Sequence, residues 1–293
     1  MRADRTTIDL GWGPVSYLSW RPDAARSAPP VVLLHGGGLD NAWLSWEALG
    51  SALADAGLRV YAPDHPGYGE SPPAPWPATQ ERLVQYVGEF LDALGLDRVT
   101  LGGLSLGGGL SLGCALDHPG RVRGLMLFGA YGLGEHQFGG VLAKPAQWLT
   151  WAALRSGLLR RGMDAYAHNR RLLTSSLRGI IRTPASLTPE LVDAVVAEAA
   201  RPHAFEAFEQ WQRDQILPGR LRTNYAPRLG DLRTPTLVVH GTHDSGVPVD
   251  QARAASRALP DATLLVVRGA GHWVQRDRPE VVIPAVKEFL RRV

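Results

Sequence analysis

The chain contains a serine, an aspartate and a histidine in sequence contexts that would allow their side chains to act together in nucleophilic catalysis. Ser105 is the centre of Gly103-Leu104-Ser105-Leu106-Gly107, between a strand-like apolar run and a segment of small residues typical of a packed helix. Where a strand turns directly into a helix, flanking glycines remove Cβ atoms that would otherwise collide. Such a turn exposes the serine hydroxyl and leaves the N–H of Leu106 at a helix N-terminus, facing developing negative charge. We therefore predict that Ser105 is a nucleophile.

The serine needs a base to take its proton, and the base needs a carboxylate to orient it. Of the nine histidines, His272 follows the apolar run 262–267 in a loop whose glycines let the side chain turn inward. Asp244 follows the apolar run 236–240. We predict a catalytic triad in which His272 is the base and Asp244 orients it.

Acyl chemistry also needs two N–H donors for the oxyanion of a tetrahedral intermediate. The N–H of Leu106 is one predicted donor. The second is expected in the glycine run that follows 31–34, where glycine permits a close approach of the backbone to the substrate. We predict Gly37 as this donor. Gly38 stays open as the alternative, because three consecutive glycines leave the register undecided.

The segments that must position these residues alternate between strand and helix patterns. Strand-type apolar runs lie at 31–34, 58–62, 98–102, 122–128, 236–240 and 262–267, after an N-terminal hairpin pattern. Helices are predicted at 43–56, 81–94, 108–116, 250–259 and 279–291. This alternation predicts a parallel sheet with right-handed crossovers, so the carboxyl ends of the strands meet at one edge.

The alternation stops between residues 132 and 229, where no convincing strand pattern occurs. Helices are predicted there at 146–161, 163–177, 191–200 and 203–216, and Thr188-Pro189-Glu190 is a start signal for the third. We predict a core made of 1–131 and 230–293, with a helical cap (lid) of 132–229 inserted into it. A cap at this point in the chain would cover the predicted nucleophile.

Taken together, these motifs resemble the α/β-hydrolase fold superfamily, specifically serine hydrolases with a helical cap. The resemblance rests on His35-Gly36-Gly37, the segment 64–71, the turn around Ser105, Asp244 and Gly271-His272-Trp273. It covers nearly the whole chain outside the predicted cap. It implies a mostly parallel eight-stranded sheet flanked by helices, and acyl transfer to water through a covalent acyl-serine.

The first expectation for the reaction is hydrolysis of a small or medium carboxylic ester. The alternative is C–C bond hydrolysis of ring meta-cleavage products, because 271–275 resembles the end motif of those hydrolases and a cap arginine would suit their anionic substrates. Leu104 departs from the asparagine usual in that family, and the glycine run lacks its glycine-proline-glycine step. A non-catalytic small-ligand receptor is the alternative of another class. Residues expected to bind substrate are Trp273, Trp148 and Trp151.

The composition of the chain indicates which kinds of binding partner to expect. The chain has 293 residues, 45% hydrophobic and 20% charged, and a formal net charge of +3 with arginines interleaved among acids, which predicts no nucleic-acid partner. Its one cysteine, no secretory pattern at 1–20 and no long apolar run predict a cytoplasmic protein without membrane contact. We expect a small-molecule substrate, no cofactor and no metal. A homodimer stays an open alternative to a monomer.

Overall fold

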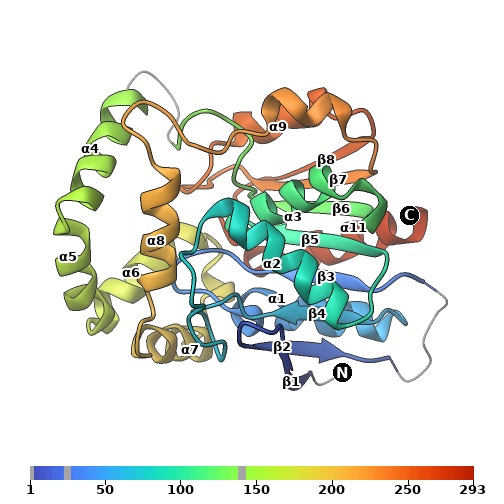
Figure 1. The fold of residues 1–293 in the computed structure, drawn as a ribbon, viewed down its shortest axis with the longest axis horizontal. Helices are drawn as coiled ribbons and strands as arrows, with labels where there is room; N and C mark the ends of the chain where they lie inside the picture. The colour runs from blue at the N-terminus through green and yellow to red at the C-terminus, as the bar shows by residue number, and fades with distance from the viewer. Residues whose placement is uncertain (1–2, 23–27, 138–142) are drawn as a thin grey trace.

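The structure is a computed structural model that describes residues 3–22, 28–137 and 143–293. An eight-stranded sheet with the strand order β1-β2-β4-β3-β5-β6-β7-β8 forms its centre (Figure 1). The pairs β1/β2 and β2/β4 are antiparallel and all other pairs are parallel. The predicted mostly parallel eight-stranded sheet is therefore confirmed. The strands are β1 (Asp4–Asp9), β2 (Pro14–Trp20), β3 (Val31–Leu34), β4 (Val60–Pro63), β5 (Val99–Leu104), β6 (Val122–Phe128), β7 (Thr236–Gly241) and β8 (Ala262–Val267).

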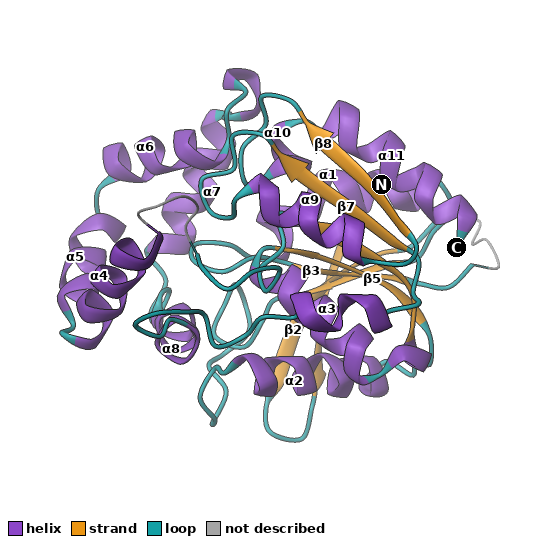
Figure 2. Ribbon diagram, turned by 90° about the horizontal axis from the view of Figure 1, so that it is seen from above, coloured by secondary structure: helices purple, strands orange, loops and turns teal. Residues whose placement is uncertain are grey.

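Helices cover both faces of the sheet, which explains why β3 and β5 are buried along their whole length (Figure 2). One face packs against α2 (Gln80–Ala93), α3 (Leu106–Asp117) and α9 (Val249–Ala258). The other packs against α1 (Ala42–Asp55) and α11 (Pro279–Arg292), which the short helix α10 (Val274–Asp277) precedes. Leu83, Val87, Phe90 and Leu91 of α2 are all buried, as their helical spacing predicts.

Between β6 and β7 the chain contributes helices and no strand of the sheet within the described residues. Figure 1 shows these helices grouped beside the sheet. The residue bounds 132–229 predicted for the cap stay a prediction, and residues 138–142 within them, like 1–2 and 23–27 of the predicted core, lie outside the described residues. The helices are α4 (Ala143–Arg155), α5 (Leu158–Ala167), α6 (Arg170–Ile180), α7 (Pro189–Ala199) and α8 (Glu206–Gln215).

The predicted division of the first cap helices is wrong. The chain breaks at Gly157, whose φ of 72° lies in the left-handed region that glycine adopts without strain, whereas Gly162 lies inside α5. A second break precedes α6, where the Asn169 side chain accepts hydrogen bonds from the N–H groups of the first turn. The start of α7 is as predicted, because Thr188 caps it ahead of Pro189.

Polar contacts fix the cap helices over the carboxyl edge of the sheet. Glu198 of α7 accepts hydrogen bonds from Asn41 Nδ2 at 2.8 Å and from the Gly69 N–H at 3.1 Å. Trp211 Nε1 of α8 donates to Gln80 Oε1 of α2 at 2.8 Å. Both contacts are largely shielded from water, so they hold the cap against the core in one arrangement.

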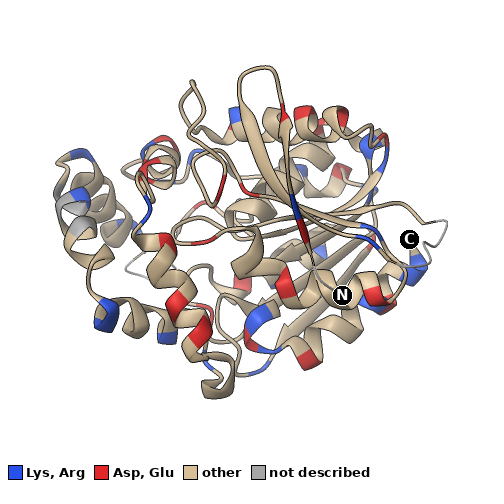
Figure 3. Cartoon of the chain, turned by 90° about the horizontal axis from the view of Figure 1, so that it is seen from below, with Lys and Arg blue, Asp and Glu red and all other residues tan. Residues whose placement is uncertain are grey.

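Figure 3 shows charged residues of both signs from below, and between residues 143 and 182 the sequence has eight basic residues and one acidic residue. No described helix is both long enough and apolar enough to cross a bilayer.

Candidate active site

Ser105 lies at the turn between β5 and α3, and its backbone is strained. Its φ of 51° and ψ of −115° are uncommon for a residue with a side chain. Glycines make the turn possible: a Cβ on Gly103 would lie 2.1 Å from Gly107 O, and one on Gly107 would lie 2.2 Å from Leu34 O. The strain is held by the hydrogen bond from the Ser105 N–H to Phe128 O at 2.9 Å.

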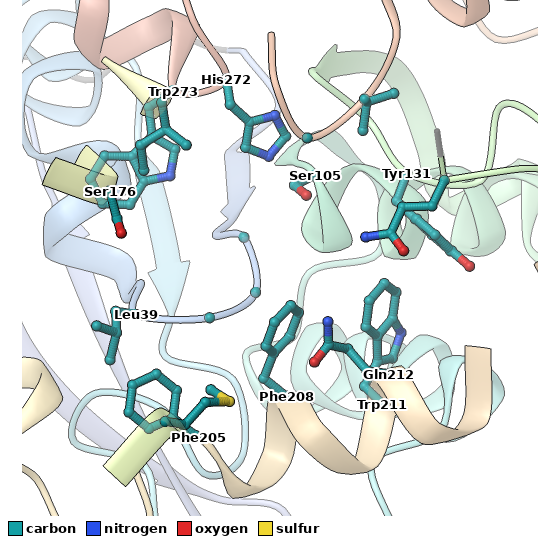
Figure 4. Close-up of a pocket in the computed structure, with 18 of the residues that line it drawn as sticks. Leu39, Ser105, Tyr131, Ser176, Phe205, Phe208, Trp211, Gln212, His272 and Trp273 are labelled. Carbon is teal, nitrogen blue, oxygen red and sulfur yellow. The ribbon is translucent and has the colours of Figure 1, made fainter. Parts of the chain in front are cut away.

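Asp244 and His272 meet at the same edge of the sheet, after β7 and β8. His272 Nδ1 donates toward Asp244 and lies 2.9 Å from each carboxylate oxygen. Asp244 Oδ1 also accepts from the N–H groups of Gly246 and Val247 at 2.7 and 2.8 Å. Figure 4 shows the imidazole ring on the side of the cavity where Ser105 lies. The structure thus brings the three predicted residues together, while their catalytic roles stay predictions.

Asp244 stays ionised although its side chain is buried. Burial alone would raise its pKa, but the neighbouring His272, its hydrogen bond and the nearby His240 together lower the pKa of this carboxyl below its usual value. An ionised Asp244 can accept the Nδ1–H of His272 and so leave Nε2 of that ring free to act as a base.

His240 is a second partner of Asp244 that sequence reasoning missed. Its Nε2 lies 3.2 Å from Asp244 Oδ2 and 2.9 Å from Val247 O. Burial lowers the pKa of His240, so a neutral ring donates one hydrogen there. The spacing of four residues between His240 and Asp244 is the only signal of this contact in the sequence. Within the described parts of the chain, no group of three or more His, Cys, Asp or Glu side chains could hold a metal ion.

The two predicted oxyanion positions flank Ser105. Leu106 is the first residue of α3, so its N–H is one of the free donors at a helix N-terminus. Gly37 and Gly38 both line the cavity that contains Ser105. The N–H of the preceding Gly36 is occupied, because it donates to Asp40 Oδ2 at 2.7 Å. The choice of Gly37 over Gly38 stays a prediction.

Asp40 holds this glycine turn from behind. Besides the Gly36 N–H, its carboxylate accepts from the Asn41 N–H at 2.8 Å and from Ser45 Oγ at 2.7 and 2.9 Å. Burial raises the pKa of Asp40 to about 7. The hydrogen bonds lower this pKa, whereas the nearby Glu198 raises it. Since both carboxylate oxygens accept backbone N–H groups, the ionised form is the one that fits the turn.

We predict that Asp40→Asn lowers kcat about 10-fold with little change in KM, because the turn is displaced without loss of an oxyanion donor. The amide nitrogen cannot accept the backbone N–H that one carboxylate oxygen accepts now. Steady-state kinetics of the folded variant test this. Ser45→Ala, which removes a side-chain donor and keeps both backbone contacts, should have a smaller effect. An unchanged kcat in Asp40→Asn would show that the turn does not depend on this carboxylate.

A cavity of about 380 Å³ lies between the cap helices and the carboxyl edge of the sheet (Figure 4). Ser105 and His272 lie on its wall together with Gly37. A Cβ on Gly37 would lie 2.4 Å from Phe208 Cε2, so the ring of this cap residue packs directly on the glycine turn. The aromatic residues that line the cavity are Tyr131, Tyr166, Phe205, Phe208, Trp211 and Trp273.

The predicted substrate-binding tryptophans separate into two groups. Trp273 lines the cavity. Trp148 and Trp151 belong to α4 and are not among its described lining residues, and Trp148 is 52% exposed. Trp151 instead packs against the hydrophobic cluster that includes α8 residues. The structure does not bring these two residues to the site, because α4 lies on the side of α8 that faces away from the sheet (Figure 1).

His35 and His65 pack beneath the glycine turn and have a structural role. Their rings lie 4.0 Å apart, and His35 Nε2 accepts the His65 N–H at 2.9 Å. Burial lowers the pKa of His35 to about 3, so the ring is neutral. A neutral, fully buried ring with both nitrogens engaged cannot act as a base for Ser105.

A strained serine, a histidine and a buried carboxylate at the carboxyl edge of an α/β sheet define a site of the serine hydrolase class. The family profile described as alpha/beta hydrolase fold matches residues 29–279. The chain therefore belongs to the alpha/beta hydrolase fold family, and the predicted resemblance is confirmed.

Several proteins with known names are similar to this chain in sequence or in fold. The chain is 32% identical over 265 residues to a 2-hydroxy-6-oxo-2,4-heptadienoate hydrolase of Pseudomonas putida, which covers 89% of this chain and 88% of that protein. The fold of the present chain matches that of a meta-cleavage product hydrolase from Pseudomonas fluorescens with a TM-score of 0.79 and 23% sequence identity. The match covers 98% of this chain and 97% of that one. A carboxylesterase from Bacillus subtilis matches with a TM-score of 0.76, at 23% identity and with 100% and 93% covered.

Proposed function

We propose that this protein hydrolyses a C–C bond next to a ketone carbonyl, through a covalent acyl-enzyme on Ser105. The similarity of the whole chain to a 2-hydroxy-6-oxo-2,4-heptadienoate hydrolase carries this proposal. The predicted site supports it, because attack on a carbonyl carbon needs the same nucleophile, base and oxyanion donors whether the leaving group is oxygen or carbon.

In the proposed mechanism His272 takes the proton of Ser105 as the hydroxyl attacks the carbonyl carbon. The N–H groups of Leu106 and Gly37 stabilise the oxyanion, and Asp244 stabilises the imidazolium. When the C–C bond breaks, the electron pair leaves with the carbon fragment and His272 returns the proton to that carbon. Water, activated by His272, then cleaves the acyl-serine and releases a carboxylic acid.

Carbon is a poor leaving group, so a C–C substrate must delocalise the electron pair over a conjugated system. A mainly apolar cavity with several aromatic walls suits a flat conjugated chain, because such surfaces stack well.

Carboxylic ester hydrolysis is the second candidate, and one observation favours it. His272 is the only described lining residue that can carry a positive charge. The cavity therefore fits an uncharged acyl group as well as it fits a dienone.

The two candidates are separated by the products formed. We would incubate the enzyme with 2-hydroxy-6-oxo-2,4-heptadienoate, with its methyl ester, and with a 4-nitrophenyl ester, and follow the products by NMR. Acetate from either heptadienoate compound, absent with Ser105→Ala, supports C–C hydrolysis. Release of 4-nitrophenol without any acetate would leave ester hydrolysis as the function. Turnover of none of the three would contradict both.

A further inference from the structure

The described lining of the cavity lacks the positively charged side chains that would stabilise an anionic substrate. The described lining residues contain no lysine, arginine, aspartate or glutamate. His272 is the one ionisable base among them, and the other polar groups are the uncharged hydroxyls of Ser105, Ser176, Tyr131 and Tyr166, the carboxamides of Gln137 and Gln212 and the indole N–H groups of Trp211 and Trp273. A carboxylate that enters such a cavity loses its hydration and finds no opposite charge in return.

Buried carboxylates lie directly behind the lining. Asp244 holds His272, and Asp40 holds Gly36, with both acids almost fully buried. Glu198 stands behind the same turn and contacts Asn41. Asp244 is ionised and contacts His272 on the cavity wall, so its negative charge disfavours a second anion beside Ser105.

Two arginines near the cavity are paired with acids. Arg276, close to Asp40, lies 3.6 Å from Glu47. Arg160 borders a neighbouring pocket that shares Met163 and Phe205 with the cavity, and it lies 3.7 Å from Glu206. Neither arginine lines the cavity itself. The described lining residues therefore offer no lysine or arginine to hold a substrate carboxylate.

The carboxamides give the cavity neutral polarity instead. Gln137 Oε1 is buried and has no hydrogen-bond partner among the described residues, so it can accept a hydrogen bond from a substrate hydroxyl. Figure 4 shows the carboxamide of Gln212 between Phe208 and Trp211. Together with the aromatic walls, these groups suit a conjugated or aliphatic compound with neutral polar substituents.

We propose that the cavity selects substrates whose enclosed part carries no carboxylate. This inference rests on the proposed function, since it specifies the substrate of the same site. It separates this chain from its relative, which is named for a dienoate and thus for an acid. The substrate class is a neutral ketone or ester, and a dienone whose acid group is esterified is a better substrate than the free acid.

Matched esters of adipic acid test the inference. The 4-nitrophenyl methyl diester and the 4-nitrophenyl monoester have the same chain and leaving group, but only the monoester carries a carboxylate. At pH 7.5 we expect kcat/KM for the diester to exceed that for the monoester by about 100-fold or more. Equal values, or a preference for the monoester, would overturn the inference and leave hydrolase activity standing. Hydrolysis of neither ester would also overturn the inference, while the acetate assay with the heptadienoate compounds decides the proposed function separately.

Two adjacent serines of α6 provide a matched pair of variants. Ser176 lines the cavity and is exposed, whereas Ser175 is exposed and is not a lining residue. Ser176→Lys brings a cation to the cavity wall, and we expect it to raise kcat/KM for the monoester relative to the diester about 10-fold. Ser175→Lys adds the same charge outside the cavity and should change that ratio less than about 3-fold. Equal effects of the two variants would show that the charge of the cavity does not set the preference.

Discussion

Replacement of Ser105 by alanine is expected to abolish hydrolysis, with a fall in kcat of about 10⁴-fold or more. The substitution removes the only nucleophile in the strained turn and keeps the turn itself, because the glycines on either side carry the close contacts. The variant should therefore fold with an unchanged thermal midpoint. Kinetics with the best 4-nitrophenyl ester or dienone found for the wild-type protein measure the loss.

A second serine-to-alanine change controls for effects of the substitution as such. Ser256 lies in α9 and is not one of the described lining residues, so Ser256→Ala should keep the wild-type rate. If Ser105→Ala retained more than a tenth of the wild-type kcat, the nucleophile would have to be another group.

Replacement of Asp244 by asparagine is expected to lower kcat about 10⁴-fold, as the same change does in other Ser-His-Asp triads. His272 donates Nδ1–H to this carboxylate, and the amide can instead donate to Nδ1, which leaves the proton on Nε2, where the base must be free. The amide also leaves the imidazolium without its counter-charge. Substrate binding should change little, because Asp244 is buried behind His272.

An exposed aspartate in the next helix provides the control for this change. Asp250 pairs only with Arg253 on the surface of α9, so Asp250→Asn should leave kcat unchanged. Steady-state and single-turnover rates of the two variants make the comparison. An Asp244→Asn enzyme within 10-fold of the wild-type rate would mean that another residue orients the base.

Much of the sheet could be predicted because its signals are local. The strands β3, β6 and β8 begin and end at the predicted residues, since each is a short apolar run with sharp ends in the sequence. The same reasoning placed Ser105, Asp244 and His272 after strands, and parallel strands bring such positions to one edge.

The cap could be predicted only as helical. Its apolar pattern runs on through Gly157, so the pattern alone does not show that the chain breaks at this glycine and not at Gly162. For the same reason the pattern could not tell which aromatic residues face the site. Trp148 and Trp151 were predicted there, whereas Phe208 of α8 lies against Gly37.

The supporting contacts of the site could not be predicted, because their partners are distant in sequence or joined by a turn. Asp40 contacts Gly36 only after the backbone folds back on itself. Glu198 reaches Asn41 across 157 residues. His240 contacts Asp244 across the turn that follows β7, where the sequence has four polar residues close together and does not show which of them meet.

The central claim is that Ser105 forms the covalent intermediate, and labelling with a fluorophosphonate tests it most directly. We would treat the wild-type protein and Ser105→Ala with the reagent and locate the adduct by mass spectrometry of peptides. The account predicts a single adduct on Ser105, slower labelling in Asp244→Asn and no adduct in Ser105→Ala. An adduct on another residue of the wild-type protein, or equal labelling of Ser105→Ala, would contradict it.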